Sequence, residues 1–387
     1  MTPIRPDSRR IGPAPRTPVY APPMIHRART PVTLLALLAA PVLAAQPDAP
    51  ADPPHPNDPD LPAIAGDDAS LMAAFTDLSS YRFRSVTFYW DNDGAYPNLI
   101  NDTDRYYTSA QGIEVGFDFN PSAAAAARLA PGWTDPVFGV GLTAEGRIYT
   151  SRDITETDPP ADDHPYAGWL SFGFAFQRSD ANRHDHFGID MGVVGPSSLA
   201  KDIQIWIHDE FPDEIRPAGW DTQLRDEFAL NLAYQRTWRT ERADLRGLQF
   251  DMLPAVRFDA GNVFLRARGQ ATLRLGANLP DDFGPASLLG FKDHTARPDP
   301  AKDWSFYGYL TVAADAVGRD IFLDGSTFSS SRSTEREILV ARTTLGLVAR
   351  YKWVQFGWAQ TFESKRFEAQ PNGQTWGSFV LGIACRF

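Results

Sequence analysis

The chain has 387 residues, a formal net charge of −11 and a single cysteine, Cys385. The acidic balance argues against a phosphate-binding surface, so nucleic acid is not an expected partner. One cysteine excludes an internal disulfide and a thiolate metal cluster. The mean hydropathy of −0.31 is compatible with a membrane barrel, whose strands expose only every second residue to lipid.

The first 80 residues carry targeting signals. Met24-Ile-His-Arg-Ala-Arg is a positive n-region, 32–43 is an apolar h-region, and small residues at 42–45 offer a cleavage site. We therefore expect a start-site extension over 1–23 and a signal peptide over 24–45. We expect 46–80 to be a disordered leader, because its first part is too rich in Pro and Asp to bury a core. The barrel domain is predicted over 81–387.

Strict period-two alternation predicts a row of β-strands in the rest of the chain. Ile113, Val115 and Phe117, for example, alternate with Glu114, Gly116 and Asp118. A soluble sandwich would not line an inner face with Glu, Arg and Asp, because unpaired buried charges are costly. The expected strands are 85–90, 111–119, 138–150, 169–177, 187–194, 227–238, 247–258, 262–275, 304–316, 338–351, 353–362 and 378–387.

The end of the chain favours the same fold. Phe379, Leu381 and Ile383 lie on one face of the last strand, together with Cys385 and Phe387. A terminal strand that stops on an aromatic residue is typical of outer-membrane barrels. The prediction is an all-β fold, a twelve-stranded antiparallel transmembrane β-barrel of the bacterial outer membrane.

An even strand number sorts the loops between the two ends of the barrel. With a periplasmic N-terminus, the loops at 91–110, 151–168, 195–226, 259–261, 317–337 and 363–377 share the outer end. Two of these loops, 91–110 and 195–226, are densest in polar functional residues. The sequence therefore predicts one site built from two separate segments.

Several motifs in these loops, taken in order, are more specific than any of them alone. They are Asn92-Asp93 at the end of the first strand, Asp104-Arg-Tyr-Tyr-Thr108, Pro165-Tyr-Ala-Gly-Trp169, and Gln204-x-x-x-His208 followed by Gly219-Trp220. From about Ser85 to Phe387 the chain resembles the outer-membrane lipid A 3-O-deacylases, which are calcium-dependent twelve-stranded barrel hydrolases.

The resemblance implies a phospholipase-A2-like site with matching positions at Asn92, Asp93, Thr108, Gln204, His208 and Glu214. It implies a Ca²⁺ cofactor, lipid A or lipopolysaccharide as substrate, and a location in the outer membrane with the site facing the outer leaflet. The expected activity is removal of a 3'-linked acyloxyacyl chain.

The residues themselves support these roles. Gln204 and His208 are four apart in a stretch that reads as helical, so they share a face, and a histidine is the usual general base near neutral pH. Asn92, Asp93 and Glu214 offer hard oxygen ligands, which suit Ca²⁺. We expect His208, Gln204, Asn92 and Thr108 in catalysis and Asp93 and Glu214 as metal ligands.

Simpler interpretations stand beside these. Asn92-Asp93 is an ordinary turn pair, Glu214 lies in an acidic run, and His208 by itself reads as a structural or surface histidine. Tyr106, Tyr107, Trp90 and Trp169 suit an interfacial aromatic girdle.

Two features stay open in the sequence. Thr108 and Gly112 are separated by two residues more than in the family, so Thr108 and Ser109 both remain candidates for the site hydroxyl. Arg147, Arg266, Arg268 and Arg274 would anchor lipid phosphates near the outer rim, whereas deeper in the lumen they would neutralise residues such as Glu145 and Asp251.

Two other functions compete with deacylation. An outer-membrane phospholipase of the serine–histidine–asparagine type would need a serine placed against both partners on one strand wall, and the sequence offers no such serine. A non-catalytic channel or adhesin would not need the polar residues gathered in 91–110 and 195–226.

Overall fold

The computed structural model describes residues 68–387 except 95, 101–102, 211–214, 298–301 and 385–387. The predicted extension 1–23, the signal peptide 24–45, Cys385, Phe387 and Glu214 lie outside the described residues. The strands are β1 (Tyr81–Asn92), β2 (Tyr106–Phe119), β3 (Val137–Thr150), β4 (Ala167–Ser179), β5 (Arg183–Val194), β6 (Glu227–Trp238), β7 (Ala243–Leu245), β8 (Leu248–Gly261), β9 (Phe264–Ala277), β10 (Trp304–Asp320), β11 (Leu339–Tyr351), β12 (Val354–Glu363) and β13 (Gln374–Ala384).

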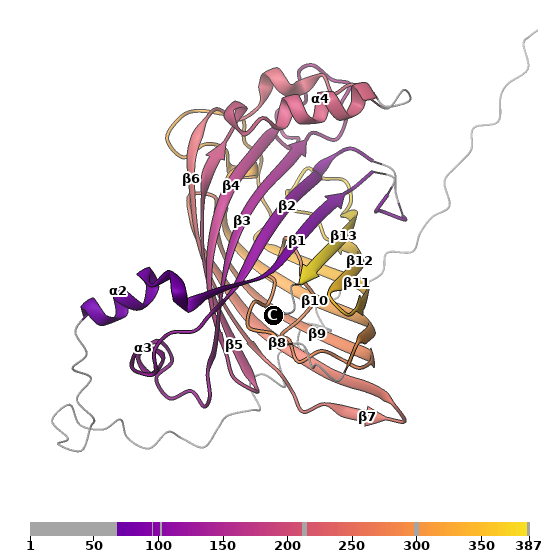
Figure 1. Cartoon of the computed structure of the whole chain (residues 1–387). Coiled ribbons are helices and arrows are strands. Elements are labelled where there is room, and N and C mark those ends of the chain that lie inside the picture. Colours follow the sequence, from indigo (N-terminus) through magenta and orange to yellow (C-terminus); the bar gives the residue numbers. More distant parts are fainter. Residues whose placement is uncertain (1–67, 95, 101–102, 211–214, 298–301, 385–387) are drawn as a thin grey trace, which may run out of the picture. The chain divides into compact units, whose positions relative to one another are not determined.

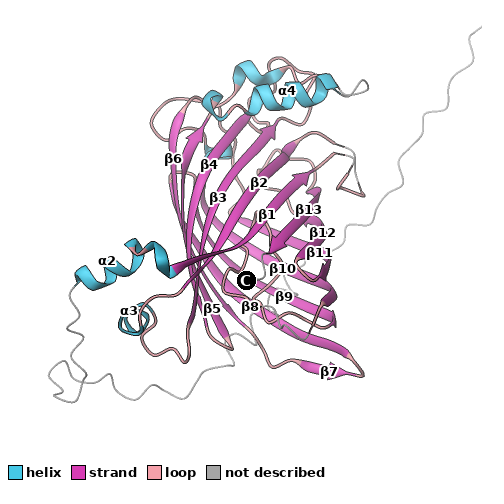
Figure 2. Cartoon of the chain, in the orientation of Figure 1, coloured by secondary structure: helices cyan, strands magenta, loops and turns pink. Residues whose placement is uncertain are grey.

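Every strand pairs antiparallel with its neighbours, and the sheet closes on itself (Figures 1 and 2). β1 pairs with β13 and β6 pairs with β8, so twelve strands surround the lumen. β7 is a three-residue addition that pairs only with β8. The predicted twelve-stranded antiparallel barrel is confirmed. The predicted strand cores were mostly shorter than the real strands, as for β1, predicted over 85–90.

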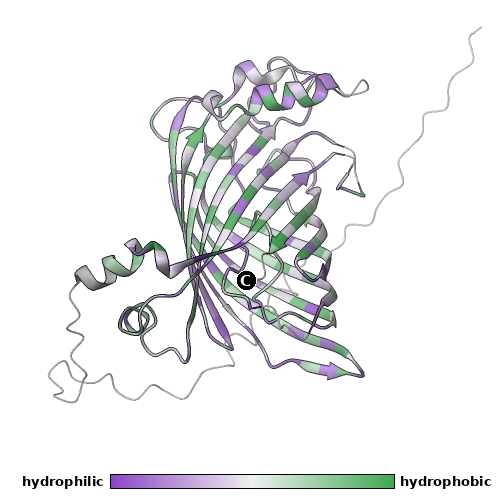
Figure 3. Cartoon of the chain, in the orientation of Figure 1, coloured by the Kyte–Doolittle hydropathy of each residue, from purple (hydrophilic) through white to green (hydrophobic). Residues whose placement is uncertain are grey.

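Hydrophilic and hydrophobic residues alternate along the strands of the wall (Figure 3), and their exposure assigns them to opposite faces. In β2, Ile113 is 39% exposed on the outer face, whereas its neighbour Glu114 is 7% exposed and faces the lumen. Phe88 of β1 and Leu381 of β13 are likewise exposed on the outer face. Such alternation is that of a lipid-facing band around a polar interior.

None of the helices in the described part of the chain has the length and apolar content that crossing a membrane requires.

The lumenal arginines are paired with carboxylates. Arg274 lies 2.7 Å from Asp251, and Arg268 lies 2.6 Å from Asp315. Arg147 pairs with Glu145 in the same way, and Arg266 pairs with Asp259. These arginines therefore neutralise buried carboxylates inside the barrel, which offsets much of the cost of burying either charge alone.

The connection between β9 and β10 folds back into the lumen. Arg147 of β3, Arg268 of β9 and Arg257 of β8 donate to the carbonyl oxygens of Leu288, Leu289 and Gly290, respectively. His294 lies 2.5 Å from Glu114 of β2, and its backbone N–H donates to Gln177 of β4. Because these partners come from facing parts of the wall, 278–297 is a plug inside the barrel; we call it the lumenal plug.

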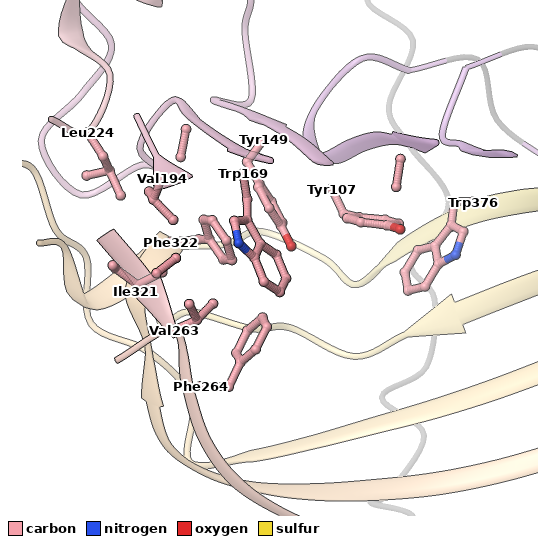
Figure 4. Packing of buried hydrophobic residues seen from close by; sticks show 13 residues of the cluster. Tyr107, Tyr149, Trp169, Val194, Leu224, Val263, Phe264, Ile321, Phe322 and Trp376 are labelled. Carbon is pink, nitrogen blue, oxygen red and sulfur yellow. The ribbon is translucent and has the colours of Figure 1, made fainter. Parts of the chain in front are cut away.

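Next to the lumenal plug, buried aromatic side chains pack together (Figure 4), and Leu288 and Leu289 of the plug pack against them. Tyr107, Tyr149 and Trp169 of the wall pack with Phe322 of α5 (Ile321–Asp324) in this cluster. The expectation of an aromatic girdle therefore fits Trp90, which is 40% exposed, but not Tyr106, Tyr107 or Trp169, which are buried.

Short helices lie against the outer face of the wall. Within the expected leader 46–80, α2 (Asp68–Thr76) and η1 (Leu78–Ser80) precede β1. Phe75 of α2 stacks on Phe119, and α3 (Ala123–Leu129) joins the same cluster. At the other end, α4 (Ala200–Glu210) packs on β3 and β4 between η2 (Pro196–Ser198) and η3 (Gly219–Thr222). We call this other end, where the loops β1–β2, β3–β4 and β5–β6 lie, the site end.

Candidate functional site

The wall of the candidate site is the outer face of β1 and β2 at the site end. Asn92 has the same outward orientation as Phe88 and Trp90, since successive residues of a strand alternate. Asn92 pairs with Ser109 of β2, and Ser109 pairs with Ile148 of β3. The candidate site therefore lies outside the lumen, on the surface that continues into the lipid-facing band.

A bulge in β2 turns two hydroxyl groups to this outer face. The register between β2 and β3 shifts between Tyr107 and Ser109, so Thr108 is an extra residue in the strand. Tyr107 and Ala110 both join the lumenal cluster, which leaves Thr108 and Ser109 pointing outward together. Thr108 Oγ1 lies 2.8 Å from Thr150 Oγ1, which donates to the Asp104 carbonyl. Ser109 Oγ instead donates to the Asp91 carbonyl at 3.0 Å.

Asp93 is a buried carboxylate that is only half satisfied. Its Oδ2 accepts from Thr103 Oγ1 at 2.8 Å and from the Arg105 N–H at 2.9 Å. Its Oδ1 has no hydrogen-bond partner among the described residues. Desolvation, and then the negative charge of Asp104, hold the pKa of Asp93 well above its ordinary value. A cation beside Asp93 would offset both effects.

His208 is oriented by contacts to both ring nitrogens. Nδ1 lies 2.7 Å from the Ile215 carbonyl oxygen, and because a carbonyl can only accept, Nδ1 must carry a proton. Nε2 lies 2.9 Å from Asp104 Oδ2 and donates to it when the ring is protonated. In the neutral ring, Nε2 carries the lone pair. His208 is 7% exposed, and its contact with Asp104 directs Nε2 at the loop between β1 and β2.

Gln204 shares the buried face of α4 with His208, as their spacing predicted. Its Oε1 accepts from Trp220 Nε1 at 2.9 Å, while its buried Nε2 has no partner within the described part of the chain. Trp220 packs with Tyr166 against Ile148 of the wall. The amide of Gln204 is thus held by one end and free to donate at the other.

Two glycines allow α4 to approach the wall. A Cβ atom on Gly168 of β4 would lie 2.0 Å from Ser198 Oγ and 2.3 Å from the Ala200 Cβ. A Cβ atom on Gly219 would lie 2.4 Å from the ring of Tyr166. Both contacts are shorter than van der Waals separation, so any side chain at either position would move the segment that carries His208.

His164 is a second histidine at this end, but it is not placed as a base. It stacks on Tyr149 and its Nδ1 lies 2.8 Å from the Pro165 carbonyl oxygen. Desolvation lowers the pKa of His164 to about 3. It is therefore a neutral packing residue, and the run from Pro165 to Trp169 serves packing as well, because Tyr166 and Trp169 are buried.

The described residues offer part of a cation shell. Asp93 Oδ1 is a buried, unpartnered oxygen of the kind that Ca²⁺ prefers, and Asp104 lies close enough to affect its charge. Asn92 does not add to this set, because its Oδ1 accepts from the Gly94 N–H in a turn. No group of three or more His, Cys, Asp or Glu side chains close enough to hold a metal is found within the ranges described.

The two loop segments do meet, as the sequence predicted. Asp93 N–H donates to the Thr108 carbonyl, and Thr108 connects through Thr150 to Asp104, which contacts His208. Sequence reasoning missed Asp104 as a site residue, although it begins one of the motifs. Its only signal was its place in that motif, and no spacing rule relates it to His208, which is 104 residues further along.

Comparisons with known proteins agree with this architecture. A sequence model of the family described as outer membrane protein LpxR matches residues 57–385. A search of curated proteins finds no match. The solved structure of LpxR from Salmonella typhimurium superposes with a TM-score of 0.63 at 17% identity, over 77% of this chain and 99% of that one.

More distant barrels superpose less well. The translocator domain of the autotransporter NalP from Neisseria meningitidis gives a TM-score of 0.35 at 11% identity, over 82% of this chain and 92% of that one. The transport unit of AIDA-I from Escherichia coli gives 0.35 at 9%, over 82% and 97%. These values carry no argument about function. On the match over 57–385, the chain belongs to the outer membrane protein LpxR family, which confirms the resemblance to the outer-membrane lipid A 3-O-deacylases.

Proposed function

We propose that the protein is a calcium-dependent ester hydrolase that removes a 3'-linked acyloxyacyl chain from lipid A. The observation that carries the proposal is the position of His208. Its Nε2 points at Asp104 of the β1–β2 loop. The same loop holds the half-satisfied Asp93, and Asp104 connects through Thr150 to Thr108 on the outer face of the wall. A site on that face is reached from the membrane, so its substrate is a membrane lipid.

His208 acts as the general base in the proposed reaction. Nε2 takes a proton from a water molecule, whose oxygen attacks the ester carbonyl carbon. The proton then passes from Nε2 to the sugar oxygen that leaves when the carbon–oxygen bond breaks. The Ile215 carbonyl keeps Nδ1 protonated throughout, and Asp104 stabilises the positive charge that the ring gains.

In the proposed reaction, the oxyanion is stabilised by the free amide of Gln204 and by a bound cation. Gln204 Nε2 donates to the carbonyl oxygen, with Trp220 holding the other end of the amide. Asp93 and Glu214 would hold Ca²⁺, with Asn92 next to Asp93 and Thr108 completing the wall. Bound Ca²⁺ would supply positive charge beside the ester oxygen.

The substrate implies an orientation in the outer membrane. Lipopolysaccharide occupies the outer leaflet, so the site end faces the cell exterior. An epitope tag between Asp221 and Arg225 should then be reached by antibody on intact cells, and one beside β7 should not. The reverse labelling would exclude this orientation.

A channel function is less well supported, because the lumenal plug and the aromatic cluster occupy the lumen. A serine-type phospholipase is also disfavoured, because Ser109 donates to a backbone carbonyl and not to a histidine.

Mass spectrometry of lipid A tests the proposal most directly. Lipid A from a host that expresses the wild type should lose the mass of one acyloxyacyl chain, and lipid A from a host that expresses His208→Ala should not. An unchanged spectrum in both hosts, with the barrel present in the membrane, would refute the activity.

A further inference from the structure

One polar side chain stands out on the lipid-facing surface below the candidate site. Gln111 of β2 faces outward, because its neighbour Gly112 faces the lumen, where a Cβ would meet Leu288 of the plug. Across the wall, the outward residues at the level of Gln111 are Trp90, Gly146 and Leu170. The next outward row is formed by Phe88, Ile113, Ala144 and Phe172.

An amide side chain that faces lipid has a desolvation cost unless it forms hydrogen bonds there. Polar groups that face hydrocarbon lose hydrogen bonds to water, so they tend to mark functional positions. Gln360, an outward glutamine of β12, shows the contrast, because the β1–β2 loop covers it and Gln360 donates to Asn98 and to the Trp376 carbonyl. Gln111 is only half-buried, so the described residues do not enclose it in the same way.

One hydrogen bond orients the amide of Gln111 toward the site. Its Nε2 donates to Ser109 Oγ, the outward hydroxyl next to Thr108. On β3, the residue paired with Gln111 is Gly146. The surface there is open, because a Cβ atom on Gly146 would meet nothing within 4 Å. A chain that descends from the site into the membrane therefore has room to pass beside this amide.

We propose that Gln111 recognises an oxygen substituent close to the scissile ester, on the acyl chain that is removed. The inference rests on the proposed ester hydrolysis and adds the basis of its selectivity. Gln111 is two residues from Ser109, roughly 6–7 Å along the strand, and its side chain reaches back toward Ser109. The oxygen that Gln111 binds is therefore near the ester carbonyl, as in 3-hydroxyacyl and 3-acyloxyacyl chains. Gly146 leaves space for the secondary acyl chain of the acyloxyacyl group.

The test uses three glucosamine lipids whose 3-O-acyl chains differ only at the third carbon: unsubstituted, hydroxylated and acyloxylated. The purified full chain in detergent with Ca²⁺ should cleave both substituted chains faster than the plain one. Gln111→Leu should lower that preference roughly tenfold, as expected for one lost hydrogen bond, with little change for the plain chain. Ile113→Leu, the next outward residue of β2, is the matched control and should change nothing.

A second variant tests the open surface at Gly146. Gly146→Val should slow the acyloxylated chain more than the hydroxylated one, because only the former carries a branch. An equal loss on all three lipids in Gln111→Leu would overturn the inference, as would an unchanged preference.

Failure of the hydrolase proposal would be recognised separately, as no cleavage of any of the three lipids by the wild type. Recognition would then be judged by native mass spectrometry of the lipids bound to His208→Ala. Preferential retention of the substituted lipids that is lost in Gln111→Leu/His208→Ala supports the inference, and equal retention overturns it.

Discussion

His208 can act as a base only through Nε2, because the Ile215 carbonyl fixes the proton on Nδ1. His208→Ala should therefore lower the rate of ester cleavage by ~10²–10⁴-fold, the usual contribution of a general base. Added Ca²⁺ should not restore the activity of His208→Ala.

Asp93→Ala should instead raise the Ca²⁺ concentration that gives half-maximal activity, so that excess metal partly restores the activity of this variant. Near wild-type deacylation by His208→Ala, or activity unaffected by chelator, would contradict the mechanism.

Asp104 is assigned a supporting role, since it contacts His208 and no reacting atom is placed on it. Asp104→Asn keeps the size of the side chain but removes the charge that stabilises the protonated ring. A hydrogen bond to a charged group is worth about 1.5–3 kcal/mol, so kcat should fall by roughly 10- to 100-fold while KM stays nearly constant. A change confined to KM would assign Asp104 to substrate binding instead.

At the level of residues, the sequence was informative where spacing along one element decides the geometry. Gln204 and His208 lie on one helical face because they are four apart, and both are buried as expected. The bulge at Thr108 could not be located, because it depends on how β2 aligns with β3. The contact between Asp104 and His208 could not be predicted either, because it depends on how two loops fold over the wall.

The position of α4 depends on the absence of a side chain at Gly168. Gly168→Ala should displace the helix, because its Cβ would overlap Ser198 and Ala200, and overpacking of this kind typically costs 1–3 kcal/mol. We expect reduced activity with the barrel still folded. Gly269→Ala is the matched control, since a Cβ there meets nothing within 4 Å. The gel shift between unboiled and boiled protein reports the barrel, and equal activity of both variants would show that the helix position is not critical.

Strands with strict polar and apolar alternation could be predicted from the sequence. The segment that fills the lumen could not. β3 and β9 follow the period-two sequence pattern over almost their whole length, whereas β2 follows it only over 111–119, beyond the bulge at Thr108. The lumenal plug has no periodic signal, and its polar, glycine-containing sequence reads as an ordinary loop. The residues that make room for the plug are in the wall strands. Gly116, Gly139 and Gly141 have no side chains and leave the space that His294 fills.

The whole barrel combines a closed lumen with a site on its outer surface. The lumenal plug and the aromatic cluster lie in series along the lumen, so no continuous aqueous path is expected. Wild-type protein inserted in a planar bilayer should therefore show no steady ion conductance, whereas an open porin measured alongside it should. Stepwise conductance as large as that of the porin would contradict a closed lumen and support a channel function.

An outward-facing site also determines the direction from which the substrate arrives. A lipid that diffuses within the leaflet can reach Thr108 and His208 sideways, whereas a water-soluble ester must approach from the loops. Cleavage should therefore depend on the surface concentration of lipid in mixed micelles. Dilution of lipid A with inert detergent at constant bulk concentration should lower the rate, while hydrolysis of a short soluble ester should be unaffected. If both rates respond equally to surface dilution, lateral entry is wrong, even with the catalytic residues correctly assigned.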